Sequence, residues 1–176
     1  MNRNVEIKAK VTSLDRIERC VQELADEGPT VLEQEDTFFN CPDGRLKLRR
    51  LADRAQAELI YYQRSDAAEP KESRYAIHRV SDPDSLVPLL SAALGVRGVV
   101  RKRRTLYRIG ATRVHLDCVA GMGQFVELEV VLEAHQSLSE GVAVARDLMS
   151  RLAIPPEGLL RPAYIDLLES DATCNS

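Results

Sequence analysis

Carboxylates and cations recur at alternate positions in several short segments of this chain. Glu127 and Glu129 are two residues apart, and so are Lys102 and Arg104. In an extended strand alternate side chains share one face, so each such pair points in one direction. Carboxylate oxygens are ligands that Mg²⁺ or Mn²⁺ prefers, while lysine and arginine bind polyanions. The side chains that together predict phosphate chemistry at a divalent metal are Glu6, Lys47, Arg49, Lys102, Arg104, Arg113, Asp117, Glu127 and Glu129.

Hydrophobic periodicity and turn residues divide the chain into strands and helices. Alternation of apolar and polar residues between turn signals indicates strands, and apolar residues at helical spacing indicate helices. The predicted strands cover residues 4–11, 33–39, 45–51, 58–63, 74–80, 99–109, 112–119 and 124–132. The predicted helices run from 13 to a stop at Gly28-Pro29, from 83 to 94 and from 139 to 153, with one or two helical turns over 163–168 and a loose tail over 170–176.

Acids and bases separate between the predicted strands. The acids gather on the first and last strands, and the bases lie mostly on the strands between them. A single strand of this kind is also compatible with an ordinary sheet whose charged face meets water. The separation of signs favours a closed barrel with charges inside and apolar faces turned outward under the helices. The predicted fold class is therefore α+β, a closed eight-stranded antiparallel β-barrel with helices packed outside, in a single domain over residues 1–169.

Composition narrows the class of protein further. The chain has 176 residues and a net charge of −3, which argues against a general nucleic-acid binder. Its apolar runs are too short to span a membrane, and it begins with a polar strand rather than a secretory signal. The four cysteines are far apart and lack metal-ligand spacing, so reduced thiols and a cytoplasmic location are expected.

Five motifs in order resemble the CYTH-domain proteins of the triphosphate tunnel metalloenzyme superfamily. That superfamily includes class IV adenylate cyclases, thiamine triphosphatases and inorganic tripolyphosphatases. The similarity covers the chain from about Asn4 to Leu168, and its mark is an ExExK strand near the N-terminus. The matching segments are Asn4–Lys8, Arg45–Arg49, Lys102–Arg104, Arg113–Asp117 and Phe125–Glu129.

The resemblance implies roles for individual residues. Glu6, Glu127 and Glu129 would hold Mg²⁺ or Mn²⁺, and Asp117 would be a further acidic ligand or a water-positioning group. It makes Glu6, Asp117 and Glu129 the catalytic carboxylates. The side chains implied to bind a small-molecule triphosphate are Lys8, Lys47, Arg49, Lys102, Arg104 and Arg113.

Two positions depart from the family pattern. Asn4 stands where the first acid of ExExK is expected, which removes one carboxylate from the metal site. The strand end Tyr62-Gln63-Arg64-Ser65 replaces a Tyr-Lys-Gly-Pro-like segment. Arg64 is a candidate for the missing substrate-binding lysine, although alternation puts Gln63 and Arg64 on opposite faces.

The predicted function is metal-dependent hydrolysis of a triphosphate, such as inorganic tripolyphosphate, thiamine triphosphate or a nucleoside triphosphate. The same site in a class IV adenylate cyclase would convert ATP to cyclic AMP and pyrophosphate. A non-catalytic triphosphate sensor is the third alternative, and an RNA 5′-triphosphatase is disfavoured by the acidic net charge.

Two further residues lie near the predicted site. His115 is either an inward general base or a structural histidine, and Tyr164 is given a packing role only. The protein is expected to be a monomer or homodimer.

Overall fold

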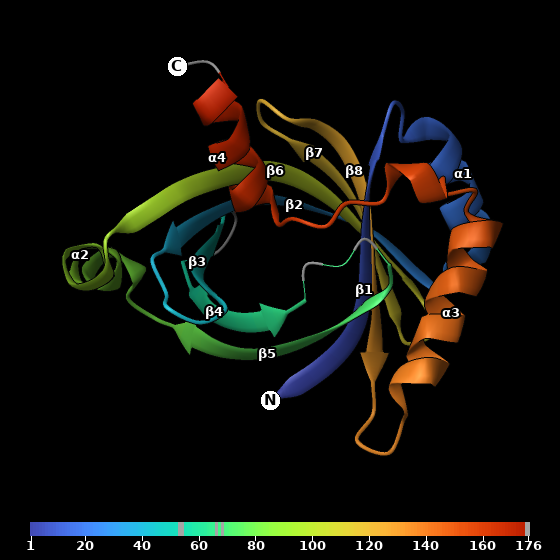
Figure 1. Cartoon of the computed structure of the whole chain (residues 1–176), viewed down its shortest axis with the longest axis horizontal. Helices are drawn as coiled ribbons and strands as arrows, with labels where there is room; N and C mark the ends of the chain where they lie inside the picture. The colour runs from blue at the N-terminus through green and yellow to red at the C-terminus, as the bar shows by residue number, and fades with distance from the viewer. Residues whose placement is uncertain (53–54, 66, 68, 175–176) are drawn as a thin grey trace.

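Eight β-strands form one closed antiparallel barrel in the computed structural model, which describes residues 1–174 except 53, 54, 66 and 68 (Figure 1). Around the barrel the strands follow the order β1-β5-β4-β3-β2-β6-β7-β8. The predicted fold class is therefore confirmed. The strands are β1 (Asn2–Val11), β2 (Glu27–Phe39), β3 (Arg45–Leu51), β4 (Ala57–Arg64), β5 (Lys71–Val80), β6 (Val96–Ile109), β7 (Thr112–Val119) and β8 (Gly123–Leu132).

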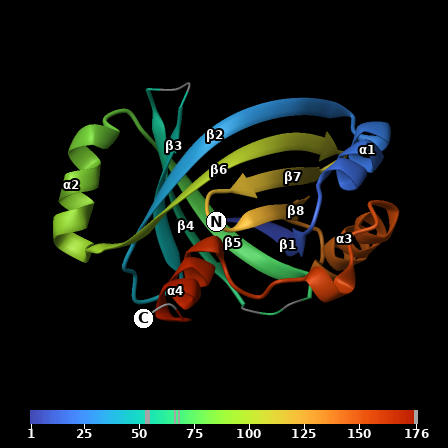
Figure 2. The same cartoon turned by 90° about the horizontal axis from the view of Figure 1, so that it is seen from above.

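The helices surround this barrel. Seen from above, α2 lies at one side of the barrel and α1 with α3 at the opposite side, while α4 lies at a third position (Figure 2). None of the described helices is long and apolar enough to cross a membrane. The helices are α1 (Asp15–Leu24), α2 (Pro83–Leu94), α3 (Leu138–Arg151) and α4 (Tyr164–Cys174), with a short 3-10 turn, η1 (Pro156–Gly158).

The hydrophobic core lies outside the barrel wall, between strands and helices. Ile7 and Leu128 turn outward from β1 and β8 and pack with Leu148 and Leu152 at α3. On the other side Leu86 and its neighbours on α2 cover outward side chains of β2 to β5. Because the apolar faces are buried by helices, the opposite faces of the same strands are left to enclose a polar interior.

The predicted end of the first helix before Gly28-Pro29 is confirmed, because α1 ends at Leu24. The predicted start of the next strand at residue 33 is wrong, because β2 begins at Glu27 and continues through Gly28-Pro29. Proline has no N–H to donate to a ladder and is confined to edges and bulges. The register between β2 and β6 shifts between Glu27 and Thr30, so a bulge accommodates Pro29 within the strand. Gly28 has φ +115 and packs closely against Tyr107, where a side chain would collide.

The last helix is longer than predicted and closes one end of the barrel. α4 extends to Cys174, so most of the predicted loose tail is helical, while residues 175 and 176 lie outside the described residues. Nothing in 164–174 is a proline or glycine that would end it. The first turn of α4 is anchored by Tyr164 and Ile165, which pack with Phe38 and Phe125.

Candidate active site

The interior of the barrel holds a cavity of about 370 Å³. Its lining comes from inward-facing side chains of every strand, because alternate residues of each strand point inward. Asp117 is the predicted site residue that does not line it. The predicted residues that do are Glu6, Lys8, Lys47, Arg49, Arg64, Lys102, Arg104, Arg113, Glu127 and Glu129.

Two carboxylates and one imidazole form a cluster on the wall made by β7 and β8. The possible ligand atoms of His115, Glu127 and Glu129 all lie within 4.8 Å of one another. His115 Nδ1 is 3.5 Å from Glu127 Oε2 and 3.8 Å from Glu129 Oε1. Burial lowers the pKa of His115 and the nearby Arg104 guanidinium lowers it further, which favours the neutral imidazole. A neutral imidazole beside two carboxylates is a donor set that fits a divalent ion.

Cations hold the same two carboxylates in their ionised form. Glu127 accepts from Arg104 Nη2 at 2.6 Å and lies 3.1 Å from Lys8 Nζ, while Glu129 lies 2.8 Å from Arg113 Nη2. Burial alone would raise the pKa of Glu127, but Lys8 and Arg104 hold that pKa well below its usual range. The cluster therefore keeps its negative charge in a buried position, as metal ligation requires.

Asp117 lies behind the cations rather than in the cavity. Its carboxylate accepts from Arg104 Nε and Nη2 at 2.7 and 2.6 Å, from Lys102 Nζ at 3.2 Å and from the Tyr164 hydroxyl at 3.0 Å. The side chain is fully buried. In this position Asp117 orients Arg104 and Lys102 toward the cavity, and the structure does not bring it into the cluster formed by His115 and the two glutamates.

Asp36 plays the corresponding part on β2, the strand next to β6, and it was not predicted. Its carboxylate accepts from Lys47 Nζ at 2.7 Å and from Arg49 Nε and Nη2 at 2.8 and 3.0 Å. Burial alone would raise the pKa of Asp36, but Arg49 and Lys47 hold that pKa well below its usual range. Two buried aspartates therefore fix two pairs of cations, one on β3 and one on β6, and these two strands are separated around the barrel by β2 alone.

Tyr164 and Arg64 also belong to the site. The Tyr164 ring lies under Lys8, whose Nζ is 3.6 Å from the ring centroid, so it does more than pack the barrel end. Arg64 faces inward and donates from Nη1 to Glu6 Oε1 at 2.6 Å. The prediction that Arg64 and Gln63 point to opposite faces agrees with this arrangement, because the cavity lining includes Arg64 and not Gln63.

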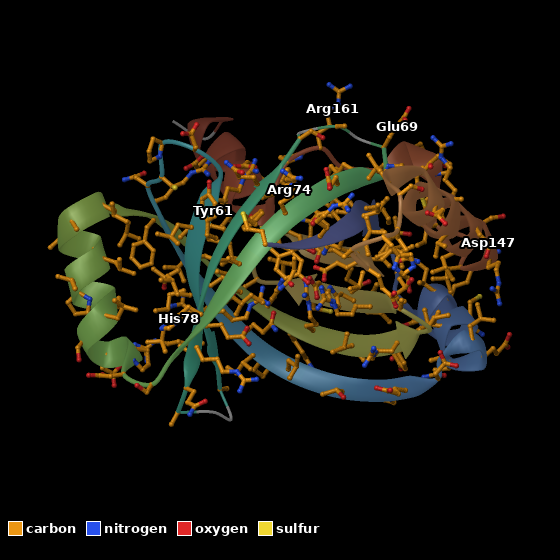
Figure 3. The ribbon with its side chains drawn as sticks, turned by 90° about the horizontal axis from the view of Figure 1, so that it is seen from below. Tyr61, Glu69, Arg74, His78, Asp147 and Arg161 are labelled. Carbon is orange, nitrogen blue, oxygen red and sulfur yellow. The ribbon has the colours of Figure 1, made fainter. Side chains whose placement is uncertain are left out.

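The alternation also predicts correctly which charges stay outside. Arg101 and Arg103 project outward and pair with Glu35 at 2.7 Å and Glu33 at 3.6 Å on the neighbouring strand. His78 is exposed on the outer face of β5 (Figure 3). These residues are therefore not part of the site.

The closed barrel with a charged interior defines a tunnel protein suited to polyanions, and sequence comparison identifies the family. The CYTH domain model matches residues 2–164, so the chain belongs to the CYTH family, within the triphosphate tunnel superfamily. It is 26% identical over 184 residues to the adenylate cyclase CyaB of Aeromonas hydrophila, covering 98% of this chain and 92% of that protein.

Solved structures share the fold. The PH1012 protein of Pyrococcus horikoshii OT3 superposes with a TM-score of 0.84 at 27% identity, over 93% of this chain and 98% of that chain. The putative adenylyl cyclase HpAC1 of Hippeastrum, for which a dominant triphosphatase activity is described, gives a TM-score of 0.67 at 14% identity, over 97% and 96% of the two chains. At 14% identity, the likeness to HpAC1 shows a shared fold and nothing more.

Proposed function

We propose that this protein is a metal-dependent triphosphatase that hydrolyses a phosphoanhydride bond of a small-molecule triphosphate. The observation that carries the proposal is that one cavity is lined both by aspartate-anchored cations and by the His115, Glu127 and Glu129 cluster. Among the lining residues that the structure describes, seven lysines and arginines face five carboxylates. This excess of positive charge supports a bound polyanion, and the cysteines with described side chains are free, as a cytoplasmic protein would have them.

The residues divide the catalytic work between them. Arg49 and Arg104 are each fixed by a buried aspartate through Nε and Nη2, which leaves the charge of the guanidinium and its Nη1 atom for phosphate oxygens. They would hold the substrate and stabilise the charge that develops on its non-bridging oxygens. Glu127, Glu129 and His115 would hold the divalent ion, with the imidazole favouring Mn²⁺ over Mg²⁺. When bound, such an ion withdraws electron density from a phosphoryl oxygen. Glu129 would orient the attacking water.

The cavity also supports an organic group on the triphosphate. Val100, which packs with Tyr164, and Leu106 are six residues apart on β6, or about 20 Å along the strand. At the Leu106 end of the cavity, five neighbouring strands contribute apolar side chains to the lining. Phosphate oxygens bind best next to cations, so this apolar end suits another part of the substrate. An aromatic ring would bury this surface while its phosphates reach Arg104. The apolar lining residues are Leu32, Leu51, Ile60, Ile77 and Leu106.

A parallel turnover assay tests the function. ATP, thiamine triphosphate and tripolyphosphate are supplied with Mn²⁺ or Mg²⁺, and phosphate, pyrophosphate and cyclic AMP are measured together. We expect phosphate release without cyclic AMP, and a higher kcat/KM for an organic triphosphate than for tripolyphosphate. Cyclic AMP with an equal amount of pyrophosphate would instead establish a cyclase, the second candidate, which the similarity to CyaB favours. Absence of every product would contradict both.

Binding of a triphosphate is also expected to take up a proton at Lys47. Burial, with Arg49 beside it, lowers the pKa of Lys47 to about 7, so its amine is mostly neutral at about pH 8. A polyanion favours the ammonium form and raises this pKa. Because the complex then holds more protons than the free protein, its Kd should increase as the pH rises above about 7.

Calorimetry of tripolyphosphate binding at about pH 8, in two buffers of different ionisation enthalpy, measures this uptake. Any proton exchange by tripolyphosphate itself is common to all the proteins compared, so the difference between them reports Lys47. Lys47→Met should reduce the uptake by a large part of one proton, whereas Lys10→Met, which alters an exposed side chain outside the cavity lining, should not. Equal uptake in the wild type and Lys47→Met would contradict the prediction.

A further inference from the structure

We propose that Arg64 takes the place of a second metal ion at Glu6, so that the tunnel works with one divalent ion and one fixed guanidinium. This inference rests on the proposed function. It gives a role in that function to the two positions that depart from the family pattern. Both positions, Asn4 and Arg64, lie in the cavity lining.

The carboxylate of Glu6 is already neutralised by protein. Glu6 Oε1 accepts from Arg64 Nη1 at 2.6 Å, and the Arg64 side chain is only 1% exposed. Glu6 pairs in register with Glu129 but is outside the cluster of His115, Glu127 and Glu129, whose possible ligand atoms lie within 4.8 Å of one another. An ion bound through both oxygens of Glu6 would have to displace a buried guanidinium, which is unfavourable. Glu127 and Glu129 are ion-paired as well, but with His115 they offer three donors to one ion, whereas Glu6 offers a single carboxylate.

The neighbouring position supplies no charge to a second ion. Asn4 and Arg64 both pair in register with Ser73, so the three residues form one row across β1, β5 and β4. Asn4 is 3% exposed, and its amide oxygen has no hydrogen-bond partner among the described residues. A neutral amide beside an ion-paired carboxylate is a poor site for Mg²⁺ or Mn²⁺, which prefer anionic oxygens.

Arg64 keeps hydrogen-bonding capacity for a ligand. Its Nε and Nη2 atoms are buried and have no partner within the part of the chain that the structure describes. Buried donors left unpaired are destabilising, so their retention on a cavity wall points to a ligand that accepts from them. A phosphate oxygen pair matches the geometry of a guanidinium fork. Glu6 then holds Arg64 in place, and Arg64 supplies the positive charge on the β1–β4 side of the substrate.

Metal and phosphate binding, measured separately, test this arrangement. Calorimetric titration with Mn²⁺ should give one ion per chain, and Glu6→Gln should keep the Mn²⁺ affinity within about threefold, while Glu127→Gln should lower it by about tenfold or more. When a chelator removes the metal, Arg64→Met should weaken tripolyphosphate binding by about tenfold or more. Arg64→Lys should weaken it less, because lysine keeps the positive charge but lacks the paired donors of the guanidinium.

Several outcomes would overturn the inference. Two Mn²⁺ ions per wild-type chain, or a tenfold loss of Mn²⁺ affinity in Glu6→Gln, would make Glu6 a metal ligand. Unchanged metal-free tripolyphosphate binding in Arg64→Met, with the variant folded by circular dichroism, would remove Arg64 from the substrate site. None of these measurements uses turnover, so a protein that bound as described but produced no product would contradict the proposed function alone.

Discussion

Glu129→Gln is expected to lower turnover of a triphosphate by about 10²- to 10³-fold, the range found when one preorganised electrostatic group is lost from an active site. The substitution keeps the shape of the side chain but removes its charge from the cluster with His115 and Glu127. It therefore weakens the divalent ion site and the orientation of water together. Phosphate release at saturating substrate and Mn²⁺ measures the effect.

The same substitution should leave metal-free binding of the substrate intact. Arg113 loses its partner at 2.8 Å in Glu129→Gln and becomes more available to phosphate. Tripolyphosphate affinity in chelator is therefore expected to be equal to or higher than that of the wild type. This split between turnover and binding distinguishes an enzyme from a triphosphate sensor, for which Glu129 would have no kinetic role.

Glu58→Gln is the matched control. Glu58 also lines the cavity, but from β4, and it is outside the cluster on β7 and β8. Its turnover should remain within about threefold of the wild type, because surrounding charges in a wide cavity act more weakly than direct ligands. Equal losses in the Glu58 and Glu129 variants would mean that net charge, and not the cluster, controls the rate.

Local alternation was sufficient to predict most of the charged side chains in the cavity lining. Alternation along β6 puts Lys102 and Arg104 on one face and Arg101 and Arg103 on the other, and the structure has the first pair inside and the second outside. This works because successive side chains of a strand point to opposite faces, so the direction of one side chain determines the direction of all the others in that strand. Closure of the barrel followed from the same alternation, since charges on facing strands need a common interior.

The partners of these charges could not be predicted from local patterns. Asp36 meets Arg49 because β2 pairs with β3 in one particular register, and that register depends on the whole barrel. Tyr164 reaches Asp117 only because α4 packs against the barrel end, which the sequence of the helix does not specify. The family resemblance implied that Asp117 is a metal ligand or a water-positioning group. Its four bonds to cations and a hydroxyl give it a structural role that depends on residues distant in sequence.

Asp117→Ala is expected to lower the free energy of unfolding by about 3–5 kcal/mol, the cost typical of breaking a buried ion pair from one side. Lys102 and Arg104 have side-chain exposures of 2% and 4%, so neither can recover the lost partner by turning to water. Urea denaturation at neutral pH, followed by circular dichroism, measures the change. Asp147→Ala removes an exposed aspartate on α3 (Figure 3) and should change stability by less than about 0.5 kcal/mol.

The pH dependence separates this effect from simple loss of packing. Burial alone would raise the pKa of Asp117, but Arg104 and Lys102 outweigh it and hold that pKa below its usual range. The stabilisation from Asp117 is thus complete above about pH 4, the pKa of an unfolded aspartate, and is lost as the pH falls toward the folded value. The stability difference between the wild type and Asp117→Ala should therefore shrink in acid.

A bound polyanion should partly replace the missing carboxylate. Tripolyphosphate would pair with Arg104 and Lys102 in Asp117→Ala, and a ligand that binds the folded state alone stabilises it by RT ln(1 + [L]/Kd). The added anion is therefore expected to raise the stability of the variant more than that of the wild type. A loss below about 1 kcal/mol without the anion, or equal stabilisation of both proteins by it, would mean that the two cations do not depend on Asp117 for their place in the wall.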